Sequence, residues 1–417
     1  MPSGAAAVGS CAVNIELMVA LVIALALFFD FTNGFHDTAN AMATPIATGA
    51  LRPRVAVGIA AILNLVGAFI STTVANTISG GLINEGPGGV LITPTLIFAG
   101  LLGAVLWNLA TWVLGLPSSS SHALFGGLIG AAIVGAGFDS LNLTVLLSKI
   151  VLPAVLAPIV AGLVSFLATR IAYATTKKRQ RDGFRIGQIF TSSLVSLAHG
   201  TNDAQKTMGV ITLTLIAGGF QAANSQPQFW VILVCAVAIA LGTYTGGWRI
   251  IKTLGKGITD IEPAQGFAAE AATTATILAS THLGFALSTT QVASGSVIGT
   301  GIGRKGASVR WRTAGRIALG WVITIPAAAL VGAGAAMVAG IGWWGILIDS
   351  VAAIVVFTAI FVLSRRTRVT SHDLALAPAQ FVRPKQRGKA KKLANQPPGA
   401  QSPGAQSSGA QSSGAES

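Results

Sequence analysis

Charged residues are scarce in this sequence. Lys, Arg, Asp and Glu make up 10% of the 417 residues, whereas a typical soluble domain carries about 25%. Hydrophobic residues make up 52%, and the mean hydropathy is +0.70. Because no water-soluble fold could bury that much apolar surface, the composition excludes a soluble protein and indicates one that is embedded in a membrane.

Cysteine is also rare. Cys11 and Cys235 lie far apart, and neither has the spacing of a metal site or a disulfide framework. The segment before Cys11, "MPSGAAAVGS", has no basic region and no apolar run. The sequence therefore predicts no cleaved signal peptide, and we expect the first membrane span to direct targeting.

The positive charge is in excess but confined to a few segments. The chain has 27 Lys and Arg against 13 Asp and Glu, a net charge of +14. The basic residues gather in 52–54, 177–185, 249–256, 304–316 and the tail after 365. By the positive-inside rule these segments lie in the cytoplasm, which places the N-terminus outside and the tail inside. The charge therefore reports topology, and no nucleic-acid partner is expected.

Long apolar runs predict an all-α polytopic membrane protein of the cell membrane with about 10–12 transmembrane segments. Polar motifs lead us to expect interruptions in the first and sixth of the predicted spans. The predicted spans are 15–49, 55–78, 94–115, 121–137, 145–173, 187–217, 229–248, 267–285, 287–303, 317–340 and 343–364.

Two polar motifs occur twice, in the order A, B, A, B. The acidic motif "NGFHDTANAMA" at 33–43 resembles "HGTNDAQKTMG" at 199–209. The hydroxyl-rich motif "SSSSHALFGGLIG" at 118–130 resembles "LSTTQVASGSVIG" at 287–299. The repeated order indicates an internal duplication. The basic loops place the first hydroxyl motif near the cytoplasm and the second near the outside, so the halves have opposite orientation.

An inverted-topology repeat with broken or short helices is an architecture of secondary transporters. The tail after about 370 is rich in Pro, Gly, Ser and Gln and should be disordered. The predicted organisation is an N-terminal segment (1–14), a first transmembrane repeat (15–173), a basic cytoplasmic loop (174–186), a second inverted repeat (187–340), a final helix (341–364) and a basic, disordered cytoplasmic tail (365–417).

The hydroxyl motifs are suited to binding an anion. Pro117 disfavours helix before the first motif, and the following hydroxyls can cap a helix whose free N–H groups face a pocket. A single Ser or Thr more often satisfies its own backbone, but two matched clusters favour a site. Lys206 could contact the anion or offset Asp203. The anion-binding candidates are Ser118, Ser119, Ser120, Ser121, Ser288, Thr289, Thr290, Gln291 and Lys206.

The acidic motifs are suited to binding a cation. A carboxylate within a membrane span is costly and usually marks an ion pathway, although an ion pair that serves folding alone is the alternative. Neighbouring amide and imidazole groups supply further ligands for a hard cation or a relay for protons. Asp30 has a weaker claim because the second half has no counterpart. The coupling-cation candidates are His36, Asp37, Asn40, Asn202, Asp203, Gln205 and Glu270.

Together the four motifs resemble the signature segments of the inorganic phosphate transporter (PiT) family, over about 31–365. The first motif is similar to the bacterial low-affinity Pit branch. The resemblance implies phosphate uptake coupled to H⁺ or Na⁺, without a bound cofactor or catalytic residue. It also implies that phosphate crosses as a neutral complex with a divalent metal such as Mg²⁺.

The sequence departs from the family pattern "P-x-S-T-T-H" in both halves. Ser120 and Ser121 replace the two Thr, and Gln291 replaces the second His. His36 stands where many members of the family have Asn, which removes an amide oxygen that Na⁺ would use. The departures favour coupling to protons.

Several alternatives stay open. Hydroxyl and N–H donors do not by themselves distinguish phosphate from sulfate, and Asn202 with Asp203 could bind Na⁺. An intramembrane hydrolase that uses a Ser of 118–121 is disfavoured because the second cluster lacks His, and a channel or receptor would lack cation coupling. The expected partners are inorganic phosphate, the coupling cation and the lipid bilayer, with a homodimer left open.

Overall fold

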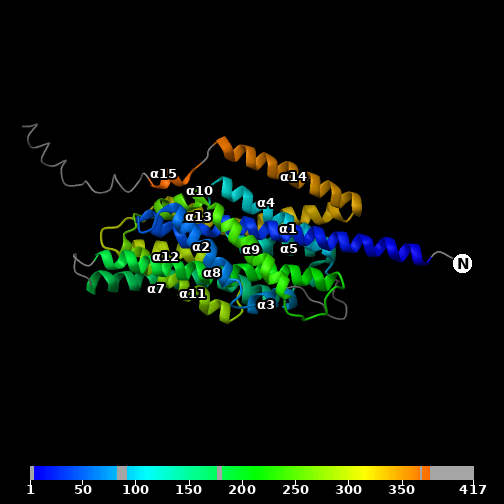
Figure 1. Cartoon of the computed structure of the whole chain (residues 1–417), viewed down its shortest axis with the longest axis horizontal. Helices are drawn as coiled ribbons and strands as arrows, with labels where there is room; N and C mark the ends of the chain where they lie inside the picture. Colours follow the sequence, from blue (N-terminus) through cyan, green and yellow to red (C-terminus); the bar gives the residue numbers. More distant parts are fainter. Residues whose placement is uncertain (1–3, 82–91, 176–180, 367–368, 376–417) are drawn as a thin grey trace, which may run out of the picture. The chain divides into compact units, whose positions relative to one another are not determined.

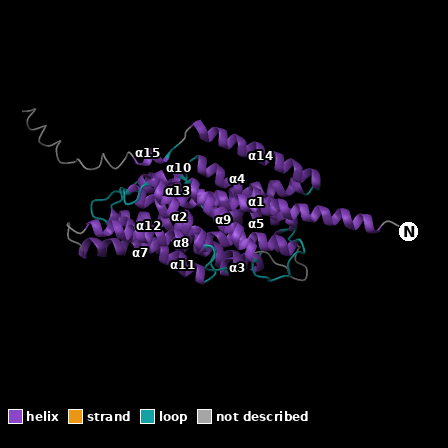
Figure 2. Ribbon diagram, in the orientation of Figure 1, coloured by secondary structure: helices purple, strands orange, loops and turns teal. Residues whose placement is uncertain are grey.

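The computed structural model describes residues 4–81, 92–175, 181–366 and 369–375. Every regular element in these ranges is a helix (Figure 2), which confirms the all-α prediction. The predicted disordered tail beyond 375 lies outside the described residues.

The helices follow the chain as labelled in Figure 1. They are α1 (Gly4–Ala47), α2 (Pro53–Gly67), α3 (Thr73–Gly81), α4 (Pro94–Val113), α5 (Ser120–Ala136), η1 (Phe138–Ser140), α6 (Leu143–Val145), η2 (Leu146–Val151), α7 (Leu152–Thr175), α8 (Arg181–Ala217), α9 (Phe229–Thr245), α10 (Trp248–Lys252), η4 (Thr253–Gly257), α11 (Pro263–His282), α12 (Thr289–Gly303), α13 (Trp311–Ala339), α14 (Trp343–Arg366) and α15 (Ser371–Ala375).

Long apolar helices confirm a multi-pass membrane protein. Within the described residues, five helical segments are long and apolar enough to span a membrane, and a sixth span results if the bent pair of α9 and α10–η4 counts as one. The two helices of that pair meet at an angle of 58°, a break that the sequence did not predict. The total of about 10–12 segments stays a prediction. The five segments are Ile15–Ala47, Pro94–Val113, Leu143–Thr175, Trp311–Ala339 and Trp343–Arg366.

The two short helices α5 and α12 begin in the same way. The Ser119 hydroxyl accepts a hydrogen bond from the backbone N–H of His122, and the Ser288 hydroxyl accepts one from Gln291. Both capping residues have extended backbone angles, with φ near −96° and −91°. This confirms that the hydroxyl motifs cap helices, as an N-cap Ser does.

The predicted interruptions at 33–43 and 199–209 are wrong. α1 and α8 run unbroken through both motifs. Their polar side chains find partners on neighbouring helices, so the backbone need not open to satisfy them. The predicted single span 55–78 is also wrong, because α2 ends at Gly67 and α3 begins at Thr73.

Helix packing follows a matched pattern in the two halves. α1 packs against α9 and α8 against α2, while α5 packs against α13 and α12 against α7. Each pair maps onto the other when the halves are exchanged, as two related repeats predict. Their opposite orientation in the membrane stays a prediction.

Matched glycines make these close contacts feasible. A Cβ on Gly34 would clash with the carbonyl oxygen of Ile239 on α9, and one on Gly200 would clash with that of Asn64 on α2. Small residues let membrane helices approach until their backbones touch. The two glycines of the acidic motifs therefore hold α1 and α8 tightly against their neighbours.

Candidate ion-binding site

The two acidic motifs meet at one buried centre. His199 Nε2 lies 2.9 Å from Asp203 Oδ2 and 3.8 Å from Asp37 Oδ2. One ligand atom from each of these three residues lies within 4.8 Å of the other two, and all three side chains are buried. α1 and α8 thus join their carboxylates in a single centre, which we call the Asp37–Asp203 centre.

The first turns of α5 and α12 contact this centre through hydroxyl groups. Ser120 Oγ donates to Asp37 Oδ2 at 2.8 Å. Thr290 Oγ1 donates to Asp37 Oδ1 at 3.0 Å, and Thr289 Oγ1 donates to Asp203 Oδ2 at 2.9 Å. The first N–H groups of a helix have no partner within the helix and favour negative charge. The hydroxyl groups predicted to bind an anion and the carboxylates predicted to bind a cation therefore adjoin each other.

Basic groups accompany each carboxylate. Lys206 Nζ forms an ion pair with Asp203 and donates to Ser121 Oγ at 2.6 Å. His36 Nδ1 lies 2.7 Å from Asp37 Oδ1. Lys206 is 1% exposed, so its charge has to be compensated inside the protein. Its position between Asp203 and the start of α5 suits both roles that the sequence left open.

The remaining hydroxyl candidates lie around the same helix ends. Ser118 Oγ donates to Thr111 Oγ1 at 2.7 Å and lies 3.4 Å from His36 Nε2. Gln291 Nε2 lies 3.3 Å from His122 Nδ1, which joins the starts of α12 and α5. Ser119 and Ser288 are occupied as the helix caps.

Among the amide candidates, Asn40 belongs to the centre. Its Nδ2 donates to Thr290 Oγ1 at 3.0 Å and to Thr289 Oγ1 at 3.3 Å. Asn202 Nδ2 donates to Thr281 Oγ1 at 2.9 Å. The side-chain oxygens of Asn40 and Asn202 are buried without a hydrogen-bond partner in the described part of the chain. Such oxygens are available as ligands for a hard cation.

Gln205 and Glu270 lie in other surroundings. Gln205 Oε1 accepts the backbone N–H of Val74 at 2.7 Å, so it caps the start of α3. Glu270 on α11 accepts hydrogen bonds from Thr191 at 2.6 Å and from Thr44. The structure therefore places Glu270 in a separate polar cluster between α1, α8 and α11.

Sequence reasoning gave too little weight to three residues. His199 bridges both carboxylates and lies four residues before Asp203, a spacing that places both on one helix face. Asn33 Oδ1 lies 2.6 Å from Ser120 Oγ and shares that hydroxyl's one hydrogen with Asp37. Asp30 is fully buried, and neither carboxylate oxygen has a partner among the described residues.

The donors of the centre suit a hard cation or a proton. Two carboxylates and one imidazole converge, together with hydroxyl oxygens, and none of them is a soft sulfur ligand. With neutral imidazoles the centre carries one net negative charge, two from the aspartates less one from Lys206.

The chain is similar to proteins of known families. Residues 33–332 match the model of the "Phosphate transporter family". A protein of Mycobacterium bovis, named "Probable low-affinity inorganic phosphate transporter", is 57% identical over 77% of this chain and 77% of its own length. Proteins with the same name from Mycobacterium leprae and Bacillus subtilis are 52% and 43% identical, over 86% and 76% of this chain and 87% and 96% of their own lengths.

A solved structure shares the fold. "The sodium-dependent phosphate transporter" superposes with a TM-score of 0.70 at 23% sequence identity, over 78% of this chain and 100% of that chain. The family match includes both acidic motifs and both hydroxyl motifs.

Proposed function

This chain is a membrane transporter that belongs to the phosphate transporter family, and we propose that it imports inorganic phosphate together with protons bound at the Asp37–Asp203 centre. Its relatives are transporters, which confirms the prediction that it is no enzyme and that it resides in the bacterial cell membrane. Phosphate is the substrate of this family.

The charge of the centre supports coupling to a cation. With both imidazoles neutral, Asp37 and Asp203 carry two negative charges, Lys206 offsets one of them, and the centre is negative. Bringing a phosphate anion to a buried centre that is already negative is strongly unfavourable unless positive charge enters with it. This single observation carries the proposal of symport, because substrate and cation then bind better together than apart.

The hydrogen bonds suggest how a proton would prepare the anion site. Ser120 and Thr290 now donate their hydroxyl hydrogens to Asp37, and Thr289 donates to Asp203. A protonated carboxyl group offers fewer acceptor positions and becomes a donor itself. Protonation would therefore release hydroxyl donors at the starts of α5 and α12 to bind the phosphate oxygens.

Imidazoles support the proton as the coupling ion. His36 and His199 contact the two aspartates, and a histidine can accept and release protons in the physiological pH range. Neither imidazole adds an oxygen ligand of the kind that Na⁺ needs. The centre thus offers several adjoining groups that can hold a proton.

Sodium is the second candidate for the coupling ion. The unpaired side-chain oxygens of Asn40 and Asn202 favour it, because Na⁺ needs several oxygen ligands. The similar solved structure is named sodium-dependent. We also propose that a divalent metal can enter with phosphate, since the paired carboxylates offer it hard ligands.

Uptake into proteoliposomes tests the coupling ion. We expect an inward proton gradient to drive accumulation of radiolabelled phosphate in Na⁺-free buffer, and a protonophore to abolish it. Accumulation that requires Na⁺ and ignores the protonophore would contradict proton coupling. Uptake without Mg²⁺ tests whether phosphate is transported as a metal complex. Competition by unlabelled sulfate tests whether the transporter distinguishes phosphate from sulfate.

A further inference from the structure

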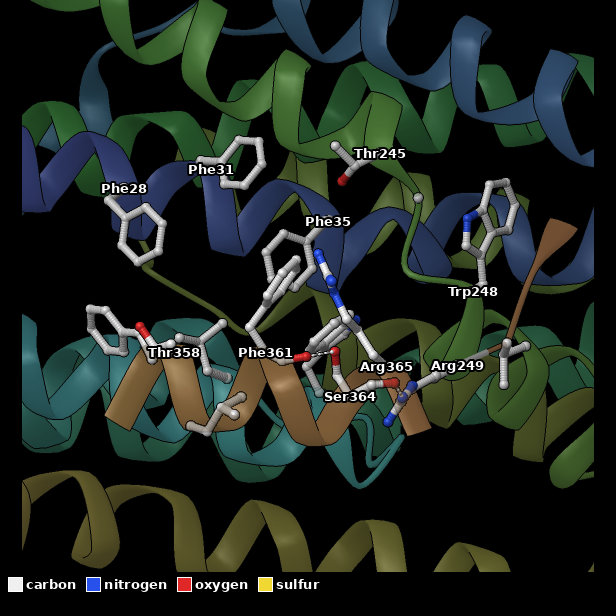
Figure 3. Close-up of a pocket in the computed structure, with 16 residues that line it drawn as sticks. Phe28, Phe31, Phe35, Thr245, Trp248, Arg249, Thr358, Phe361, Ser364 and Arg365 are labelled. Atoms are coloured by element: carbon white, nitrogen blue, oxygen red, sulfur yellow. Dashed lines mark hydrogen bonds between the residues drawn. The ribbon is translucent and has the colours of Figure 1, made fainter. Parts of the chain in front are cut away.

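A groove of about 950 Å³ lies outside the ion-binding site, between α14 and the helices α1, α4 and α9–α10. α14 lies beside α4 in Figure 1, and among the described helices it packs mainly against α4 and α13. Figure 3 shows side chains from α1 and α14 facing each other across the groove. We call it the α1–α14 groove.

Aromatic rings form one long wall of this groove. Along α1, the rings of Phe28 and Phe31 lie 6.4 Å apart, and those of Phe31 and Phe35 lie 5.7 Å apart. Phe35 packs on Trp112 of α4 at 5.2 Å, and Phe28 packs on Phe357 of α14 at 5.5 Å. The wall offers an apolar surface about two helical turns long, or ~10 Å.

Two arginines lie at the end of the groove beside Phe35 and Trp112. Arg249 donates to the carbonyl oxygens of Val113 and Ser364, both at 2.6 Å, so its guanidinium is fixed between α4 and α14. Arg365 is exposed and forms no ion pair with any described residue. Its guanidinium stacks 4.8 Å from the Phe361 ring, and Figure 3 shows it extending into the groove towards Phe35.

The polarity of the groove matches the orientation of the chain. Arg249 and Arg365 belong to basic segments that the positive-inside rule places in the cytoplasm. The aromatic wall runs from there into the apolar part of the membrane along α1. A molecule that fits has a negative group at the cytoplasmic surface and an apolar chain that points into the bilayer.

We propose that the α1–α14 groove binds an anionic phospholipid of the cytoplasmic leaflet. Its phosphate group lies at Arg365 and Arg249, and one acyl chain packs along Phe31 and Phe28. Basic pockets between membrane helices on this side suit such head groups. Free phosphate is a poorer occupant, because it would leave the aromatic wall unfilled. The proposal does not depend on the coupling ion or on the ion-binding site.

Neighbouring arginines supply a matched test. Arg365 lines the groove, whereas the adjacent Arg366, which is also exposed, does not. We compare the full-length wild-type protein with Arg365→Gln, Arg366→Gln and Thr358→Trp. Thr358 lines the groove, and its hydroxyl donates to Ile354 O of the same helix and to no other described residue. Tryptophan at this position therefore fills the space without removing charge.

The measurement is native mass spectrometry of lipid retained after exchange into detergent, followed by titration with phosphatidylglycerol or phosphatidylcholine. We expect preferential binding of phosphatidylglycerol by the wild type and by Arg366→Gln. Arg365→Gln should weaken this binding about fivefold, the factor for ~1 kcal/mol per basic side chain. Thr358→Trp should weaken the binding of both lipids. Millimolar inorganic phosphate should not displace the bound lipid.

An equal loss of phosphatidylglycerol binding in Arg365→Gln and Arg366→Gln would overturn the proposal. Any basic side chain at this helix end would then be sufficient to bind the lipid. Equal binding of both lipids by the wild type would also overturn it, as would displacement by inorganic phosphate. Size-exclusion profiles and circular dichroism show whether the variants are folded. If Arg365→Gln is not folded, Arg365→Lys provides the second test, with retained charge and retained preference for phosphatidylglycerol expected.

Discussion

Ser120 at the start of α5 donates a 2.8 Å hydrogen bond to Asp37 on α1, so the hydroxyl motif of the first half lies against its acidic motif. Thr289 of the second half contacts Asp203 in the same manner, at 2.9 Å. A change of charge on either carboxylate therefore alters the hydrogen bonds of the hydroxyl groups that we propose bind the anion.

Removing one carboxylate charge should abolish concentrative uptake. We expect Asp37→Asn and Asp203→Asn each to prevent phosphate accumulation in proteoliposomes, because the amide keeps the volume but cannot carry a proton or balance a cation. Asp349→Asn on α14 is the control, since Asp349 lies in a membrane helix but outside the centre. Normal accumulation by both centre variants would refute the assignment of the cation site.

Removing hydroxyl donors should weaken phosphate binding. We expect Ser120→Ala and Thr289→Ala to raise the KM for phosphate roughly tenfold or more, because hydrogen bonds to charged groups contribute about 1.5–3 kcal/mol. Initial uptake rates over a range of phosphate concentrations measure the effect. Ser148→Ala is the control, because its exposed hydroxyl bonds only to Thr144 O in its own segment. If the double variant Ser120→Ala/Thr289→Ala had an unchanged KM for phosphate, the anion would have to bind at another site.

Lys206 should be essential for stability as well as for transport. Lys206→Met leaves Asp203 buried without its ammonium partner, and breaking a buried pair costs about 3–5 kcal/mol. We expect a clearly lower Tm in a thermal-shift assay. The double variant Lys206→Met/Asp203→Asn should regain stability without regaining uptake. A double variant as unstable as Lys206→Met would indicate that packing, rather than charge, accounts for the loss.

Matched glycines should be intolerant of a methyl group. Gly34→Ala and Gly200→Ala each drive a Cβ into a backbone carbonyl of the neighbouring helix, and overpacking of a tight contact typically costs about 1–3 kcal/mol. We expect a lower Tm and reduced uptake for both. Gly58→Ala on α2 is the control, because a Cβ there meets no atom within 4 Å. A Tm equal to that of the control would show that the helices can separate without cost.

Local rules were sufficient for part of this site. Pro117 and the following serines predicted a capped helix, and the structure has one that begins at Ser120. The repeat singled out Asp37 and Asp203 as matched candidates, but that they meet at one centre came only from the structure. Composition alone was enough to predict a helical membrane protein.

The surroundings of the other candidate residues depended on contacts between helices that are distant in sequence. Gln205 lies beside Asp203 in the motif, yet a helix turns its side chain towards α3. Glu270 is buried in a membrane helix as expected, but its partners Thr44 and Thr191 come from two other helices. No spacing rule within one segment reveals such partners.

Because α1 is unbroken, it limits how the centre can open alternately to the two sides of the membrane. A helix that keeps its hydrogen bonds through Asp37 cannot hinge there, so it has to move as a rigid rod or stay still. Thr44 lies two turns further along the same rod and bonds to Glu270. A displacement of α1 along its axis relative to α11 would therefore strain the Thr44–Glu270 contact.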